Sequence, residues 1–179
     1  MSTPATPVTV TTTYVELVAR DRFRPAFLAD PDLAVIPARE PSPDFYRFLY
    51  ATAGRDYAWT DRSAWTDAQL LDYLSRPAVT VLPLYLRGTP VGYVELNADA
   101  DEPGTEIAYL GVFPPYHGRG FGKHLLSVGV ARAFDAGATR VWLHTCSLDG
   151  PHALANYLAR GFVVYRTETE DQLVAAASS

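Results

Sequence analysis

The chain has 179 residues, of which 48% are hydrophobic and 20% charged, and its formal net charge is −5 at pH 7. This length suits a single domain with a sizeable core, and the composition excludes a disordered chain. The acidic pI of about 5.3 argues against nucleic acid as the main partner. No apolar run approaches the ~18 residues of a membrane span, and no secretion signal is recognisable. The single cysteine, Cys146, excludes a disulfide framework and a cysteine-rich zinc site, so we expect a cytoplasmic protein.

The N-terminal part of the chain predicts one strand. Residues 1–13 carry no charge and are rich in threonine, so we expect them to be loose. An edge strand is also predicted to start near residue 8 and to run to residue 18. Together with the helices that follow, residues 14–77 are expected to form an N-terminal strand and a helical cap within a single domain, 1–179.

Two helices are predicted in this cap. Ser42 is suited to cap a helix over 43–53, which Gly54 ends. A second, shorter helix is predicted over 67–75, before a proline.

The pattern changes to strands after residue 77. The runs 79–86, 90–96 and 105–113 are rich in β-branched and aromatic residues and are joined by short turns, which predicts an antiparallel meander.

The last third of the chain alternates helices with strands. A helix is predicted from the glycine-rich loop to Gly137, then a strand at 139–146, a helix at 151–160 and a strand at 162–167. The whole predicts an α/β fold with a mixed, partly parallel sheet, in which residues 78–168 are the core.

The glycine-rich segment before the long helix is the strongest chemical signal. Glycines at 118, 120 and 122 allow backbone N–H groups to converge at a helix N-terminus, which favours a bound phosphate. A Walker loop fails because His117 and His124 stand where glycine and Ser or Thr are needed. A dinucleotide fingerprint fails because Lys123 takes the place of its third glycine.

The segment and its surroundings resemble the GNAT acyltransferases. The strand reads Leu110-Gly111-Val112-Phe113-Pro114, and the loop reads His117-Gly118-Arg119-Gly120-Phe121-Gly122. Upstream stands Thr105-Glu106-Ile107, and downstream Tyr157-Leu158-Ala159-Arg160-Gly161-Phe162, similar to the family's helix-to-strand corner. The four pieces come in the family's order over about half of the chain.

This sequence departs from the family in three places. His117 replaces the usual Gln or Arg of the phosphate loop, and Gly150 stands where many members carry Asn, so a pantetheine contact is lost or comes from Asn156. The family usually finishes with a hairpin, whereas here only 172–177 remain for a last strand. That strand is expected to be truncated or contributed by a partner, and an exposed last strand favours a homodimer.

The resemblance implies that acetyl-CoA is the co-substrate and that no metal is needed. The amide of Val112 would stabilise the oxyanion, and the loop amides would hold the pyrophosphate, with Lys123, the only lysine of the chain, beside it. The residues expected to hold acetyl-CoA are Leu110, Gly111, Val112, His117, Gly118, Arg119, Gly120, Phe121, Gly122, Lys123 and Asn156.

The resemblance also implies an acid and a base. A carboxylate must remove a proton from the ammonium before it can attack. Glu106 is the first candidate and Glu95, in the middle of the preceding strand, is its rival, and both can act through one water network. Tyr157 is expected to protonate the leaving thiolate.

The acceptor side is indicated by aromatic residues. Tyr57, Trp59 and Trp65 lie in a loop-like part of the cap and predict a partly apolar acceptor pocket; that they join the cap to the sheet is the alternative. His144 and Cys146 alternate on one strand, and we interpret them as packed core rather than as metal ligands.

The sequence therefore predicts an N-acetyltransferase that acts on a small-molecule or amino-acid-like amine. The alternatives are a non-catalytic acyl-CoA sensor or interaction module, and an acetyltransferase of protein amines. No nucleic acid or membrane is expected as a partner.

Overall fold

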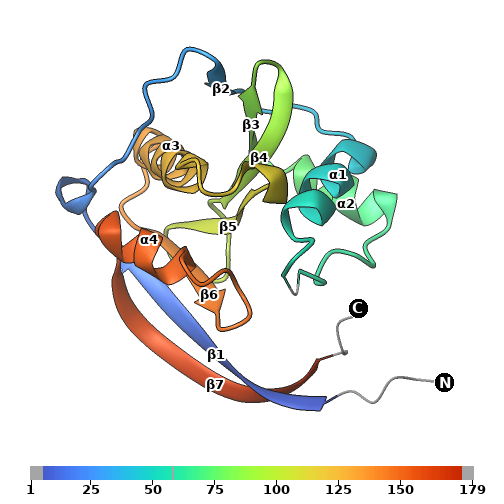
Figure 1. Cartoon of the computed structure of the whole chain (residues 1–179), viewed down its shortest axis with the longest axis vertical. Helices are drawn as coiled ribbons and strands as arrows, with labels where there is room; N and C mark the ends of the chain where they lie inside the picture. Colours follow the sequence, from blue (N-terminus) through green and yellow to red (C-terminus); the bar gives the residue numbers. More distant parts are fainter. Residues whose placement is uncertain (1–5, 58, 175–179) are drawn as a thin grey trace.

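A computed structural model describes residues 6–57 and 59–174 of the chain, which form a seven-stranded mixed sheet with helices on both faces (Figure 1). The strands are β1 (Thr6–Leu17), β2 (Leu33–Val35), β3 (Val79–Leu86), β4 (Thr89–Asn97), β5 (Thr105–Val112), β6 (Val141–Cys146) and β7 (Val163–Val174). The helices are α1 (Pro43–Ala53), α2 (Asp67–Leu74), α3 (Phe121–Asp135) and α4 (Ala153–Ala159). Their order in the sheet is β2-β3-β4-β5-β6-β1-β7.

The mixed α/β fold and its central meander are confirmed. Strands β3, β4 and β5 pair antiparallel in succession, and β5 and β6 are parallel. Helix α1 has the predicted bounds because Ser42 Oγ accepts a hydrogen bond from the amide of Phe45. Helix α2 begins with a complete capping box between Thr66 and Gln69.

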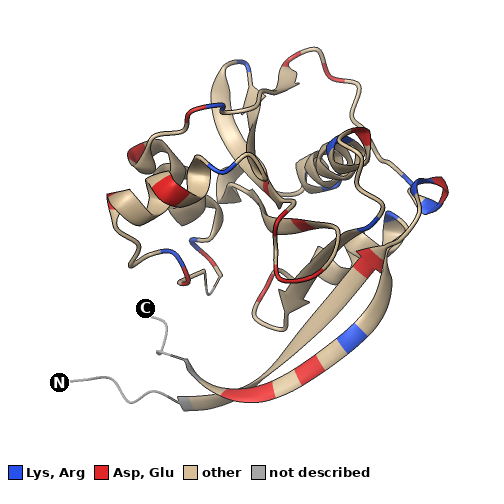
Figure 2. Cartoon of the chain, turned by 180° about the vertical axis from the view of Figure 1, so that it is seen from behind, with Lys and Arg blue, Asp and Glu red and all other residues tan. Residues whose placement is uncertain are grey.

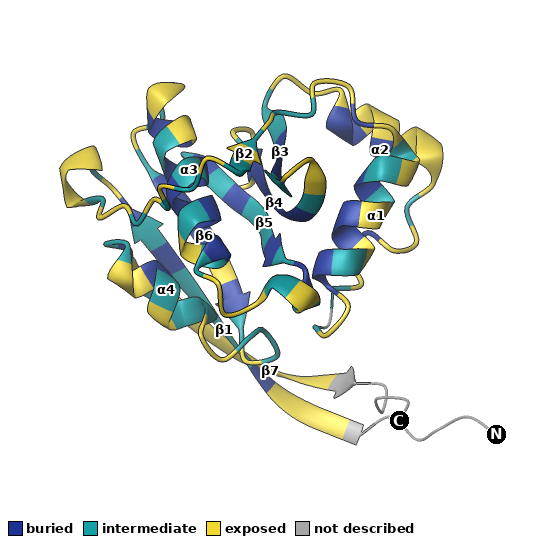
Figure 3. Cartoon of the chain, turned by 45° about the horizontal axis from the view of Figure 1, so that its top comes forward, coloured by how far each residue is buried: buried dark blue, intermediate teal, exposed yellow. Residues whose placement is uncertain are grey.

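Two hydrophobic clusters hold the helices to the sheet. Helices α3 and α4 cover one face, where Leu125, Leu126 and Val130 of α3 are fully buried against β4 and β5. Helices α1 and α2 cover the other face through a cluster rich in tyrosine. Figure 3 shows the buried inner sides of α1 and α3 facing the central strands. Gly129 permits the close approach of α3, since a Cβ there would lie 3.1 Å from Val94 Cγ2.

The position of β1 corrects three expectations. β1 is not an edge strand, because it lies between β6 and β7 and pairs with both. Of residues 1–13, which were expected to be loose, 6–13 belong to this strand and 1–5 lie outside the described residues. The expected last strand at 172–177 does not stand alone, because residues 172–174 continue β7 and the rest lie outside the described residues. The strand that pairs with β7 is β1, from the same chain rather than from a partner.

Strand β7 forms an edge of the sheet and is acidic along its outer half. Its last half contains the acidic residues Glu168, Glu170 and Asp171, and Figure 2 shows red bands along this strand. Charged side chains on an edge strand oppose its pairing with another strand of the same kind. Within residues 6–57 and 59–174, no helix is long and apolar enough to cross a membrane.

The inner position of β1 predicts a large difference between two valines that lie two residues apart. Val10 is 1% exposed and Val8 is 37% exposed. Replacement of Val10 by alanine should lower the free energy of unfolding by about 1–3 kcal/mol, because buried methyl groups are lost. The same change at Val8 should cost less than about 0.5 kcal/mol. Urea titration of both variants measures this difference, and equal, small losses would show that β1 contributes little to the core.

Candidate active site

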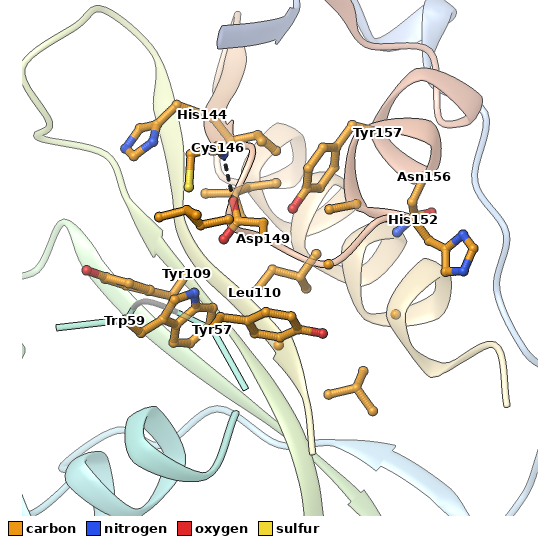
Figure 4. A pocket seen from close by; sticks show the side chains of 18 of the residues that line it. Tyr57, Trp59, Tyr109, Leu110, His144, Cys146, Asp149, His152, Asn156 and Tyr157 are labelled. Atoms are coloured by element: carbon orange, nitrogen blue, oxygen red, sulfur yellow. Dashed lines mark hydrogen bonds between the residues drawn. The ribbon is translucent and has the colours of Figure 1, made fainter. Parts of the chain in front are cut away.

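A cleft of about 920 Å³ opens where β5 and β6 diverge. The two strands pair only at Thr105–Val141 and Glu106–Trp142. An extra residue in β5, Ala108, forms a bulge opposite β4 just beyond this point, and bulges bend the strand that carries them. Figure 4 shows the cleft with Tyr57, Trp59 and Tyr109 on one side and His144, Cys146 and Tyr157 on the facing side.

The amide of Val112 points into the gap between β5 and β6. The amide of the next residue, Phe113, donates to the carbonyl of Val91 at 2.8 Å. Successive N–H groups of a strand point to opposite sides, so the Val112 N–H points away from β4. Val112 also lines the cleft. This geometry gives Val112 an N–H group that is free of the β4 ladder and can donate to an oxygen atom bound in the cleft.

His117 holds this part of the strand. Its Nε2 lies 2.7 Å from the carbonyl oxygen of Val112, and because a carbonyl only accepts, the ring donates through Nε2–H. The resemblance implied that His117 contributes to the phosphate grip. In the structure its ring instead fixes the carbonyl of the residue proposed to bind the oxyanion.

The glycine-rich loop leads into α3 with a free N-terminus. Gly118 and Gly120 have φ angles of 76° and 79°, and Gly120 is the N-cap of the helix. A Cβ on Gly122 would have Val112 Cγ2 as its nearest neighbour, at 4.0 Å, so this glycine faces open space toward β5. The first N–H groups of a helix and its dipole attract phosphate. The loop and helix therefore offer an anion site at the wall of the cleft.

Most residues expected to hold acetyl-CoA line this cleft. They are Leu110, Gly111, Val112, His117, Gly118, Gly120, Phe121, Gly122, Lys123 and Asn156. Arg119 is the exception: it is exposed, and its guanidinium lies 4.8 Å from the centre of the Phe121 ring.

Glu106 lies at the narrow end of the cleft, at the last pair between β5 and β6. Its side chain is 17% exposed. Burial, followed by the negative charge of Glu95, raises the pKa of Glu106 to about 7, although Arg62 opposes the shift. A carboxylate with a pKa near neutrality is well matched to taking a proton from an ammonium group.

Tyr157 lies on α4 at the opposite wall and is 8% exposed. Burial raises the pKa of its phenol, and the negative charge of Asp149 raises it further. Asp149 is held by Thr145 Oγ1 at 2.6 Å and by the amide of Cys146 at 2.8 Å (Figure 4). Tyr157 therefore stays protonated at neutral pH and can donate a proton.

Glu95 lies outside the cleft, beneath the cap. Its side chain is fully buried, and its carboxylate accepts hydrogen bonds from Arg62 Nη1 at 2.5 Å, Tyr73 at 2.6 Å and Tyr46 at 2.7 Å. Both carboxylate oxygens are engaged by buried donors, and the side chain does not line the cleft. Its position supports a structural role rather than that of the rival base.

Arg62 is the partner that the sequence did not reveal. Its guanidinium lies 4.1 Å from the centre of the Tyr73 ring, 4.7 Å from that of Tyr109 and 5.0 Å from that of Trp65. A glutamate in the middle of a strand predicts a buried partner of opposite charge. The residues around Glu95 in the sequence do not indicate which arginine this partner is. The ion pair fixes the loop between α1 and α2, which carries part of the cleft wall.

This loop supplies the aromatic side of the cleft. Tyr57 and Trp59 both line it, and Trp59 packs against Tyr109 with ring centres 4.9 Å apart. Gly111 makes room for Trp59, since a Cβ there would lie 3.0 Å from Trp59 Cη2 and 2.7 Å from Ala53 Cβ. Trp65 lies elsewhere, against Tyr73 and Arg62.

The interpretation of His144 and Cys146 as packed core is wrong. The His144 side chain is 50% exposed, and both residues line the cleft. Both lie on the face of β6 opposite to Val141 and Leu143, which pack in the core with residues of α3 and α4. Within the described part of the chain, no three His, Cys, Asp or Glu side chains gather as they would around a metal ion.

Comparison with known proteins agrees with this geometry. Residues 38–162 match the Acetyltransferase (GNAT) family, and the chain belongs to that family. Uncharacterized N-acetyltransferases of Mycobacterium bovis and Mycobacterium tuberculosis are 33% identical over 104 residues. The match covers 58% of this chain and 65% of each relative, so part of each relative lies outside it.

Solved structures share the fold. A GCN5-related N-acetyltransferase from Kribbella flavida aligns with a TM-score of 0.63 and 23% identity, over 92% of this chain and 58% of that one. An aminoglycoside acetyltransferase from an uncultured soil metagenomic sample aligns with a TM-score of 0.60 and 20% identity, over 74% of this chain and 90% of that one.

The buried ion pair predicts that loss of one charge is costly. Replacement of Glu95 by glutamine leaves the Arg62 guanidinium buried without a counter-charge, which should lower the free energy of unfolding by about 3–5 kcal/mol. The matched control is Asp72→Asn, which breaks the exposed Arg76–Asp72 pair and should cost at most about 0.5 kcal/mol. Urea unfolding of both variants tests the contrast, and a loss below 1 kcal/mol for Glu95→Gln would contradict it.

Proposed function

We propose that the protein transfers an acetyl group from acetyl-CoA to the primary amine of a small-molecule or amino-acid-like acceptor by direct attack. The observation that carries the proposal is the meeting of three features in one cleft. These are the amide of Val112, the free N-terminus of α3 and the carboxyl group of Glu106. A non-catalytic sensor of acyl-CoA needs only the first two.

The wall formed by β5 and α3 fits acetyl-CoA. The pyrophosphate would lie on the amides of the loop from Gly118 to Gly122, with Lys123 adding a positive charge. The thioester carbonyl would accept from the Val112 N–H, which stabilises the negative charge that develops on this oxygen. Asn156, on α4, lies where it can replace the pantetheine contact missing at Gly150.

Glu106 and Tyr157 would move the protons. Glu106 takes a proton from the acceptor ammonium, and the freed lone pair attacks the thioester carbon. The C–N bond forms, the C–S bond breaks, and the thiolate takes a proton from the Tyr157 phenol. The nitrogen then gives up its second proton, which restores the phenol of Tyr157 directly or through water. Both side chains line the same cleft, so no covalent enzyme intermediate is required.

The acceptor would enter on the aromatic side of the cleft. Tyr57, Trp59 and Tyr109 form this side, and the carboxylate of Asp61 accepts a hydrogen bond from Tyr109 at 3.0 Å. Aromatic faces and a carboxylate both favour a cationic amine. The cytoplasmic location, the independence of metals and the homodimer stay predictions of the sequence.

The direct test is release of free thiol from acetyl-CoA in the presence of a panel of amines, amino acids and aminoglycosides. The last class is included because one structural neighbour is an aminoglycoside acetyltransferase. Amine-dependent thiol release supports the enzyme. If acetyl-CoA binds but no thiol is released with any free amine or peptide, the non-catalytic sensor is supported instead. Thiol release with peptides alone would indicate a protein acceptor.

Binding of acetyl-CoA is predicted to depend on Gly122. Acetyl-CoA should raise the melting temperature of the wild type, since a ligand that binds only the folded state stabilises it. Leucine at position 122 favours the helix, and its Cβ would meet no protein atom closer than Val112 Cγ2 at 4.0 Å, so its side chain would extend into the space beside Val112. Gly122→Leu should fold and lose the shift in a thermal melt. Arg132→Leu, on an exposed position of the same helix, should keep the shift, and a wild type that shows none would disprove the cofactor assignment.

The base is predicted to titrate near neutral pH. Because Glu106 must be ionised to accept a proton and its pKa is about 7, kcat/KM should fall as the pH drops below about 7. Glu106→Gln should lower turnover roughly 10²–10⁴-fold and keep the acetyl-CoA thermal shift. Steady-state rates from pH 5.5 to 9 measure both effects. If Glu95→Gln folds and shows this loss of turnover while Glu106→Gln stays active, Glu95 is the base and Glu106 is not.

A further inference from the structure

His144 is a half-exposed histidine next to the base that the mechanism above leaves unused. Its Nε2 lies 3.9 Å from Glu106 Oε1, across the gap between β6 and β5. This distance is within the range of an ion pair and longer than a hydrogen bond, so a direct proton transfer requires the two side chains to move closer. Figure 4 shows the His144 ring on the rim of the cleft, away from Tyr157 and Asn156.

The reaction must export a proton, and Glu106 is poorly placed to do so alone. In a complete turnover the acceptor nitrogen loses two protons, the sulfur gains one, and one is left for the solvent. The Glu106 side chain is 17% exposed, whereas that of His144 is 50% exposed. A proton that remained on Glu106 would block the next turnover, so the buried base needs a route to water.

We infer that His144 carries the proton from Glu106 to the solvent. The protonated carboxyl group of Glu106 passes its proton to Nε2 of the neutral imidazole, and the imidazolium releases a proton to water or buffer at its exposed edge. The proton balance is kept, since one proton enters and one leaves the ring in each cycle. This inference rests on the proposed function, because it assumes that Glu106 is the base.

The groups around His144 are compatible with this role. The ring of Tyr14 on β1 lies 5.5 Å away, and the Tyr14 hydroxyl donates to Glu168 on β7. Arg166 of β7 lies over the outer face of Tyr14, 3.7 Å from the ring centre. On the β5 side the charged neighbour is Glu106, whose own surroundings include Glu95 and Arg62. The negative Glu106 thus faces His144 directly, while Arg166 is paired with Glu102 at 2.7 Å.

The test is chemical rescue of His144→Gln. Glutamine keeps a polar side chain of similar size but carries no proton between pH 6 and 8. In a dilute buffer we expect kcat to fall about tenfold or more, while the acetyl-CoA thermal shift is kept. Added imidazole, at constant pH and ionic strength, should restore kcat with a saturable dependence on its neutral form. The wild type should be insensitive to the same addition.

His152→Gln is the matched control, since His152 lies on the opposite wall at the start of α4. Its rate should not respond to imidazole. If His144→Gln keeps the wild-type rate in dilute buffer, or loses rate without rescue by imidazole, the relay is disproved. If the wild type itself releases no thiol with any amine, it is the proposed function that has failed.

Discussion

The divergence of β5 from β6 is the constraint on which the site depends. Two parallel strands that stayed paired would have no space between them, and their amides would be used in the ladder. Here the pairing stops at Glu106, and the bulge at Ala108 follows at once. The same divergence therefore opens the cleft, frees the Val112 amide and leaves Glu106 partly buried at the narrow end, where it faces His144 across the gap. Each of these consequences is a property of backbone pairing rather than of one side chain.

The buried Glu95–Arg62 ion pair is the interaction that fixes the helical cap on the sheet. It joins α1, α2 and β4 through Tyr46 and Tyr73, and it holds the loop that carries Tyr57 and Trp59. Buried ion pairs contribute little net stability compared with apolar residues, but their hydrogen bonds require one geometry. The negative charge of Glu95 also reaches Glu106 and raises its pKa. One side chain thereby holds the wall proposed for the acceptor and raises the pKa of the proposed base, although it does not line the cleft itself.

Local signals in the sequence predicted the local parts of this structure well. Ser42 defines the start of α1, the run from Val79 to Leu86 defines β3, and the glycines at 118 and 120 define the start of α3. Pairings between distant residues left weaker signals. Nothing near Glu95 selects Arg62, and the alternation of His144 and Cys146 is equally consistent with a core strand, because their exposure depends on what covers that face of β6.

The strand β1 pairs with residues that are farthest from it in the sequence. These pairings also affect how the site forms. β1 contributes Val10, Thr12 and Tyr14 to the cleft, yet its partners β6 and β7 lie near the other end of the chain. Contacts between segments far apart in sequence close large loops and form slowly. The meander of β3, β4 and β5 can form from local contacts, whereas β6 gains its second neighbour only when β1 has docked. Since β6 carries His144 and Cys146, the wall of the cleft opposite β5 is complete only once both ends of the chain have joined the sheet.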